Sequence, residues 1–155
     1  MDSKTPNPNR LQLSAESRLQ LIAWARAAAP DEACGLLLGR RRGERVEVEH
    51  VRLARNVAAD AHRAFEVHPE DHLAFSLEVE RQGLDVVGAW HSHPRGPATL
   101  SAADLAAAAP GWAQVVVALA ASDTPELRAW LVEHRCGSHE LELTERPTPS
   151  SRYGS

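Results

Sequence analysis

Two histidines, His91 and His93, lie one residue apart directly after an apolar run from 84 to 90. The run contains Val-Val and Trp, which favour a pleated, enclosed strand. Side chains two positions apart in a strand leave on the same face, so both imidazoles are expected to project together from its carboxyl end. Functional groups are often placed at such ends. Two imidazoles on one side are part of a ligand set that zinc accepts.

A third candidate ligand follows a short, proline-containing segment. Ser101-Ala-Ala-Asp104 opens a helical run of Leu and Ala. Taken alone, this pattern is an ordinary helix start, with serine as the N-cap and an acidic residue in the first turn. Beside the two histidines it has a second interpretation, because a helix N-terminus placed there delivers the Asp104 carboxylate to a metal. A catalytic zinc site uses three protein ligands and leaves the fourth position to water. His91, His93 and Asp104 are therefore the predicted zinc ligands.

Glu32 lies far upstream, between the end of a predicted helix and the start of a short apolar strand. Its spacing leaves two interpretations open: a solvated loop carboxylate, or a general base beside a metal. Its pairing with the histidine motif favours the base. Cys34, two residues later, is expected to be a small buried side chain. With only Cys136 besides it, the chain shows no disulfide framework, and we predict that both thiols stay reduced.

Together these residues resemble the JAMM signature of the MPN domain metallopeptidases. That signature consists of Glu, later His-Ser/Thr-His-Pro, six residues, Ser, two residues and Asp. Glu32, the run from 91 to 94, Ser101 and Asp104 fill every defining position. The run Pro-Asp-Glu-Ala-Cys-Gly-Leu-Leu-Leu-Gly is similar to the small, single-domain prokaryotic members. The chain departs from many relatives at Leu100, where they have proline, which affects loop geometry and no ligand.

The resemblance implies a zinc metallopeptidase or isopeptidase that cleaves after the Gly-Gly tail of a ubiquitin-like or sulfur-carrier protein. Zinc would lower the pKa of a water molecule from ~15.7 to roughly 7. Glu32 would accept the proton of that water, and the Ser101 hydroxyl could donate to the oxyanion. Two alternatives remain open: a non-catalytic MPN-type module that binds a ubiquitin-like partner, and a zinc hydrolase of small molecules. The identity of the carrier and the oligomeric state do not follow from the sequence.

Length and composition indicate one globular domain. The chain has 155 residues, of which 43% are hydrophobic and 25% charged, values ordinary for a soluble protein. The net charge is −4, and Arg40–Arg42 is the only basic cluster, placed where a hairpin turn is expected. This composition argues against a nucleic-acid partner. No apolar stretch approaches the roughly twenty residues of a membrane span, and the N-terminus lacks the apolar core of a signal peptide. We therefore predict a cytoplasmic protein.

Helical and strand patterns alternate along the chain, which predicts an α/β or α+β domain with a mixed β-sheet flanked by helices, as expected for an MPN/JAMM-like single domain. Helices are expected to begin at Ser14, Pro69 and Ser101. Strands are expected at 33–39, 45–51, 64–68, 84–91, 114–120, 127–133 and 141–144. Residues 1–12 are predicted to be a flexible N-terminus, 13–145 the domain and 146–155 a disordered tail.

Overall fold

The computed structural model describes residues 7–119, 124–133 and 137–147. In this part of the chain, seven strands close into a barrel in the order β1-β3-β2-β4-β5-β6-β7. Strand β1 is parallel to both β3 and β7, and β4 is parallel to β5, whereas the remaining neighbours are antiparallel. The elements are β1 (Arg10–Leu13), α1 (Ala15–Ala28), β2 (Cys34–Arg42), β3 (Arg45–Ala54), α2 (Pro69–Gln82), β4 (Asp85–His93), α3 (Ala102–Ala107), β5 (Ala113–Ala118), β6 (Glu126–Glu133) and β7 (Gly137–Glu145).

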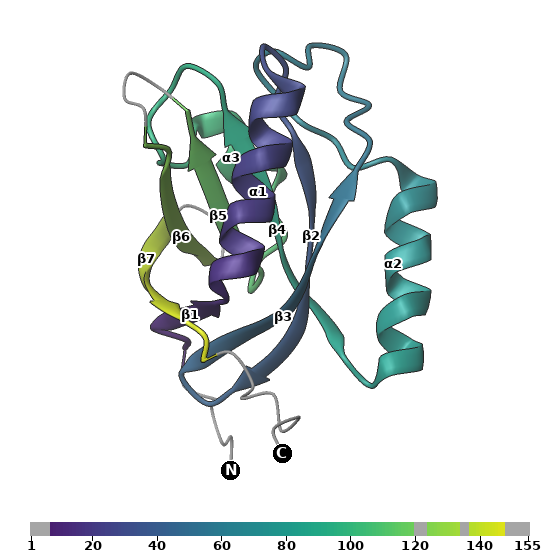
Figure 1. Cartoon of the computed structure of the whole chain (residues 1–155), viewed down its shortest axis with the longest axis vertical. Helices are drawn as coiled ribbons and strands as arrows, with labels where there is room; N and C mark the ends of the chain where they lie inside the picture. Colours follow the sequence, from purple (N-terminus) through teal and green to yellow (C-terminus); the bar gives the residue numbers. More distant parts are fainter. Residues whose placement is uncertain (1–6, 120–123, 134–136, 148–155) are drawn as a thin grey trace, which may run out of the picture.

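The predicted mixed sheet with flanking helices is confirmed, and its closure into a barrel is new. Figure 1 shows α1 running along the curved sheet and α2 on the far side of β2 and β3 from α1. Ser14 caps α1 by accepting the N–H of Ser17, and α2 ends at Gly83 in the left-handed conformation. Among the described residues, none of the helices is long and apolar enough to cross a membrane. The cytoplasmic location stays a prediction.

Backbone hydrogen bonds continue past both expected ends of the domain. Residues 10–12, expected to be flexible, pair in β1, and Leu11 and Leu13 are buried in the barrel. Four residues are too few to show a period in the sequence. At the other end, Arg146 donates its backbone N–H to the Leu13 carbonyl and contacts the Glu49 carboxylate at 2.6 Å. Residues 1–6 and 148–155 lie outside the described residues.

The predicted strand at 64–68 is wrong, apart from one isolated bridge between Asn56 and Val67. This segment is part of the loop from 55 to 68, which joins β3 to α2. The Asn56 side chain donates to the Ala64 carbonyl and accepts the Glu66 N–H. In a sheet, a neighbouring strand would bind these two groups. Tertiary hydrogen bonds therefore override the local strand preference of this segment.

Alternation along β4 separates the core from the candidate site. Trp90 is fully buried in the main core, where its ring stacks on Trp24 with the centroids 5.7 Å apart. The Ala89 side chain points to the opposite face and joins a second cluster that includes Leu36 of β2 and Val79 of α2. His91 has the same parity as Ala89, so the site lies outside the barrel core.

Gly35 packs against neighbouring backbone so closely that no side chain fits. A Cβ on this residue would lie 1.7 Å from the Arg52 carbonyl oxygen and 2.4 Å from Trp90 Nε1. Those two atoms are themselves hydrogen-bonded at 2.9 Å. We expect Gly35→Ala to lower the free energy of unfolding by about 3 kcal/mol or more in a urea titration, because neither atom can move without breaking this contact. Gly96→Ala, whose Cβ would meet no atom closer than 3.7 Å, is the control; equal midpoints for both variants would contradict the expectation.

Candidate metal centre

His91 and His93 are held on a strand that is paired on both sides. His91 lies opposite Cys34 of β2, and His93 lies opposite Ala118 of β5. Between them, the fully buried Ser92 accepts the Ala33 N–H on Oγ at 2.8 Å and donates its own N–H to the Ala33 carbonyl at 3.0 Å. The bonds to Ala33 and the pairing with β5 extend β4 through His93, whereas the strand was expected to end at residue 91. The histidines therefore project from rigid backbone.

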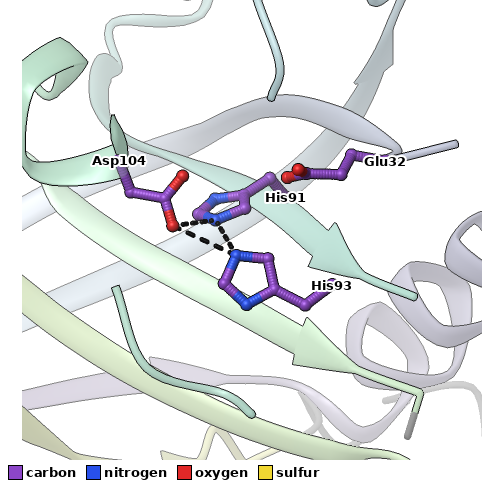
Figure 2. Close-up of side chains that lie close together, drawn as sticks. All are labelled: Glu32, His91, His93 and Asp104. Atoms are coloured by element: carbon purple, nitrogen blue, oxygen red, sulfur yellow. Dashed lines mark hydrogen bonds and ion pairs between the residues drawn. The ribbon is translucent and has the colours of Figure 1, made fainter. Parts of the chain in front are cut away.

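The three predicted ligands meet at their donor atoms (Figure 2). The Nε2 atoms of His91 and His93 lie 3.1 Å apart, and each lies 3.1 Å from Asp104 Oδ2. Asp104 is placed by a capping box, in which Ser101 Oγ accepts the Asp104 N–H at 3.0 Å and Ser101 N–H donates to Asp104 Oδ2 at 2.9 Å. The cap interpretation of Ser101 and Asp104 thus describes the observed geometry, and the same geometry turns the carboxylate toward the histidines.

The donor set fits a metal ion. His93 Nδ1 lies 2.7 Å from the Pro97 carbonyl, which can only accept, so Nδ1 carries the proton of the neutral ring. The Nε2 lone pair of His93 then faces Nε2 of His91 and Oδ2 of Asp104, which is the orientation that a metal ligand needs. A tetrahedral ion with bonds of about 2.0–2.1 Å separates its donors by roughly 3.3 Å, close to the observed 3.1 Å. The cluster of His91, His93, Asp104 and Glu32 is therefore compatible with a metal ion.

Burial shapes the charge state of these ligands. Desolvation lowers the pKa of the fully buried His91 imidazole, which favours the neutral form that binds metals. Burial alone would raise the pKa of the Asp104 carboxyl, but its interactions with the two histidines and the hydrogen bond from the Ser101 N–H outweigh it and hold that pKa well below its usual range. Asp104 is therefore a carboxylate at neutral pH.

Glu32 joins the cluster from a different part of the chain. Its ligand atom lies within 4.8 Å of those of the other three residues, and Figure 2 shows it on the opposite side of His91 from Asp104. The side chain is buried, and Oε1 has no hydrogen-bond partner among the described residues. Burial raises the pKa of the Glu32 carboxyl to about 7, with His93 opposing and Asp104 adding to the rise. A pKa near neutrality suits a group that must both accept and release a proton.

An open cleft of about 1150 Å³ gives access to this cluster. Glu32, His93 and Ser101 line it, together with two loop segments that contribute Asp60, His62, Arg63, residues 94–97 and Thr99. The structure therefore brings all five predicted site residues together at one place. Their roles as ligands, base and oxyanion donor stay predictions.

Three further residues complete the description of the site. The Phe65 ring stacks on His91 with the centroids 4.4 Å apart and the planes at 19°. Asn56 donates to the Glu32 carbonyl at 2.9 Å. Sequence reasoning missed both, because they lie in the loop that was expected to contain a strand. Cys34 is fully buried, as expected, and burial raises its pKa to about 12, which keeps the thiol protonated. Cys136 lies outside the described residues.

Comparisons with known proteins agree with this geometry. Residues 14–133 match the family described as prokaryotic homologs of the JAB domain. A desampylase of Haloferax volcanii is 34% identical over 113 residues, which cover 70% of this chain and 80% of that protein. A "Probable TtuB-protein conjugate cleaving protease" of Thermus thermophilus is 39% identical over 93 residues, which cover 60% of this chain and 57% of that protein. The solution structure of DSY2949 from Desulfitobacterium hafniense superposes with a TM-score of 0.81 at 29% identity, covering 94% of this chain and 99% of that one.

Proposed function

Because this chain belongs to the family of prokaryotic homologs of the JAB domain, we propose that it is a zinc metallopeptidase. It hydrolyses the peptide or isopeptide bond that follows the C-terminal Gly-Gly of a ubiquitin-like or sulfur-carrier protein. The observation that carries the proposal is the convergence of three ligand atoms, mutually 3.1 Å apart, with a buried carboxylate at the end of an open cleft. A module that only binds its partner has no need of this donor set.

His91, His93 and Asp104 would hold the zinc ion. When bound there, the ion would supply a water molecule whose pKa is lowered from ~15.7 to roughly 7, and a Lewis acid beside the scissile carbonyl. Glu32 accepts the proton of the attacking water and passes it to the leaving amine, a transfer that its pKa of about 7 favours.

Ser101 is placed to stabilise the developing oxyanion. Its Oγ already accepts the Asp104 N–H through a lone pair, which leaves its own proton free to be donated into the cleft. The carbonyl oxygen of the scissile bond gains negative charge in the transition state and would take that proton as a hydrogen bond. Capping and catalysis are therefore compatible roles for this hydroxyl.

The substrate class rests on the relatives and on the shape of the cleft. One relative bears the name desampylase, and the name of the other describes cleavage of a protein conjugate. An extended Gly-Gly tail suits an open cleft beside a buried metal centre, because glycine lets the substrate backbone approach the ligands closely. The body of the carrier would remain outside, against the rim.

The proposal predicts a sharp dependence on the tail. The purified chain should release a reporter from a Gly-Gly-ending carrier, joined either linearly or through a lysine side chain. Replacing the glycine beside the cut by valine should lower kcat/KM by at least about tenfold, since the branched side chain keeps the carbonyl away from the ligands. Initial rates on matched fusions measure this. Equal rates on Gly-Gly and Gly-Val tails would indicate a general peptidase, and carrier binding without cleavage would indicate a binding module.

A further inference from the structure

The loop from 55 to 68, here called the site loop, contacts two residues of the candidate centre, Glu32 and His91. The Ala61 carbonyl accepts the backbone N–H of Glu32 at 2.8 Å, and the Phe65 ring covers His91. The ends of the loop are joined by the N–H of His68, which donates to the Arg55 carbonyl at 3.0 Å. The loop is thus a closed unit laid against the proposed base and one proposed ligand.

Asn56 links this loop to Glu32. Its Oδ1 accepts the N–H groups of Ala58 and Glu66, each at 3.0 Å. Its Nδ2 donates to the Ala64 carbonyl at 3.1 Å and to the Glu32 carbonyl at 2.9 Å. These four bonds use the full hydrogen-bonding capacity of an amide side chain. Two N–H groups on one side and two carbonyls on the other also define which amide atom is oxygen.

The Glu32 backbone depends on this loop because the sheet does not hold it. Strand β2 begins at Cys34, and both backbone hydrogen bonds of Glu32 in the described structure go to the site loop, through Ala61 and Asn56. Its carboxylate gains no orientation from a hydrogen bond at Oε1, which has no partner among the described residues. The direction of the side chain therefore follows from the position of its backbone and from packing.

We propose that Asn56 is a positioning residue, which holds the Glu32 backbone where the carboxylate faces the three ligand atoms. This inference rests on the proposed function for its catalytic consequence, and on geometry alone for the holding of Glu32. A displacement of about 1 Å in a reacting group can cost on the order of 100-fold in rate. The Asn56 amide links the loop interior to the Glu32 carbonyl. Its loss is therefore expected to lower turnover strongly, although Asn56 is no proposed ligand and does not take part in the reaction.

The test compares Asn56→Asp and Asn56→Ser with Val57→Ala in the full chain. Aspartate keeps the size of the side chain but has no N–H donors, so its carboxylate would face the Glu32 and Ala64 carbonyls and repel them. Serine is polar but too short to reach all four partners of Asn56. Val57 is the matched control, because it is the next residue, is 42% exposed and contributes to the loop through its backbone N–H to Glu66. Amide hydrogen exchange by NMR is measured with zinc and after chelation, alongside zinc content and steady-state kinetics on a Gly-Gly fusion.

We expect both Asn56 variants to speed exchange of the Glu32 amide by at least about tenfold and to lower kcat by about tenfold or more. The loss in kcat should exceed any change in KM, and zinc content and β5 exchange should be unchanged, because the substitutions remove no ligand and leave β4 and β5 intact. Val57→Ala should match the native protein in every measurement.

Three outcomes would overturn the inference: native Glu32 exchange in both variants, faster exchange with native kcat, or a general loss of protection that includes β5. Failure of the proposed function has a different signature. If the native protein cleaved no conjugate, the exchange of Glu32 would still report whether Asn56 holds it.

Discussion

Glu32→Gln is expected to reduce turnover by at least about 100-fold while the protein keeps its fold and its zinc. General-base catalysis contributes typically 10²–10⁴-fold, and an amide cannot accept a proton from water. The substitution is close to isosteric and introduces no charge. Because burial already raises the pKa of this carboxyl to about 7, a neutral side chain is tolerated at the same position.

Single-turnover rates on a Gly-Gly fusion, zinc analysis and thermal unfolding together measure this expectation. Loss of turnover with full zinc content would show that Glu32 acts as a base and is not one of the zinc ligands. Glu32→Asp is a useful second variant, because it keeps a carboxyl group but shortens the side chain by one methylene. A rate between those of the native protein and Glu32→Gln would show that the position of the carboxylate matters as well as its ability to accept a proton. Near-native turnover in Glu32→Gln would reduce Glu32 to a buried loop carboxylate.

His93→Ala is expected to abolish both zinc binding and activity. The native protein should contain close to one zinc per chain, with bonds of ~2.0–2.2 Å to nitrogen and oxygen. Removing a direct ligand should cost more than the 10–100-fold that is typical when groups behind a ligand are lost. Chelation of the native protein should abolish activity in the same way, and added zinc should restore it. Zinc should also raise the Tm of the native protein, because an ion that binds only the folded chain stabilises it.

His139→Ala is the matched control for this substitution. His139 lies in β7 and contacts Glu133 and the Pro8 carbonyl, so its loss should leave zinc content and turnover unchanged. Metal analysis after dialysis and an anomalous difference map from zinc-supplemented crystals provide the measurements. Full zinc content in His93→Ala, or no anomalous peak between the three side chains of the native protein, would exclude the ligand assignment.

The parts of the site that the sequence predicted correctly depend on local geometry. A strand has a period of two, so the placement of His91 and His93 on one face follows from their spacing alone. A capping box also spans four consecutive residues, so the sequence of that segment alone predicts that Asp104 turns toward Ser101. For Glu32 the spacing left two interpretations open, and only the family resemblance joined it to the histidines. In the structure that proximity comes from the pairing of Cys34 with His91.

The remaining features required the tertiary structure. Strand β1 exists because β3 and β7 pair with it on both sides, and four residues contain no signal of partners that distant. Asn56 is an ordinary loop asparagine in the sequence, and its four partners are defined only once the loop closes over Glu32. The raised pKa of Glu32 likewise comes from burial, which is a property of the packed molecule. Neighbouring residues determine periods and caps, whereas strand pairing, loop closure and desolvation depend on contacts between residues far apart in the chain.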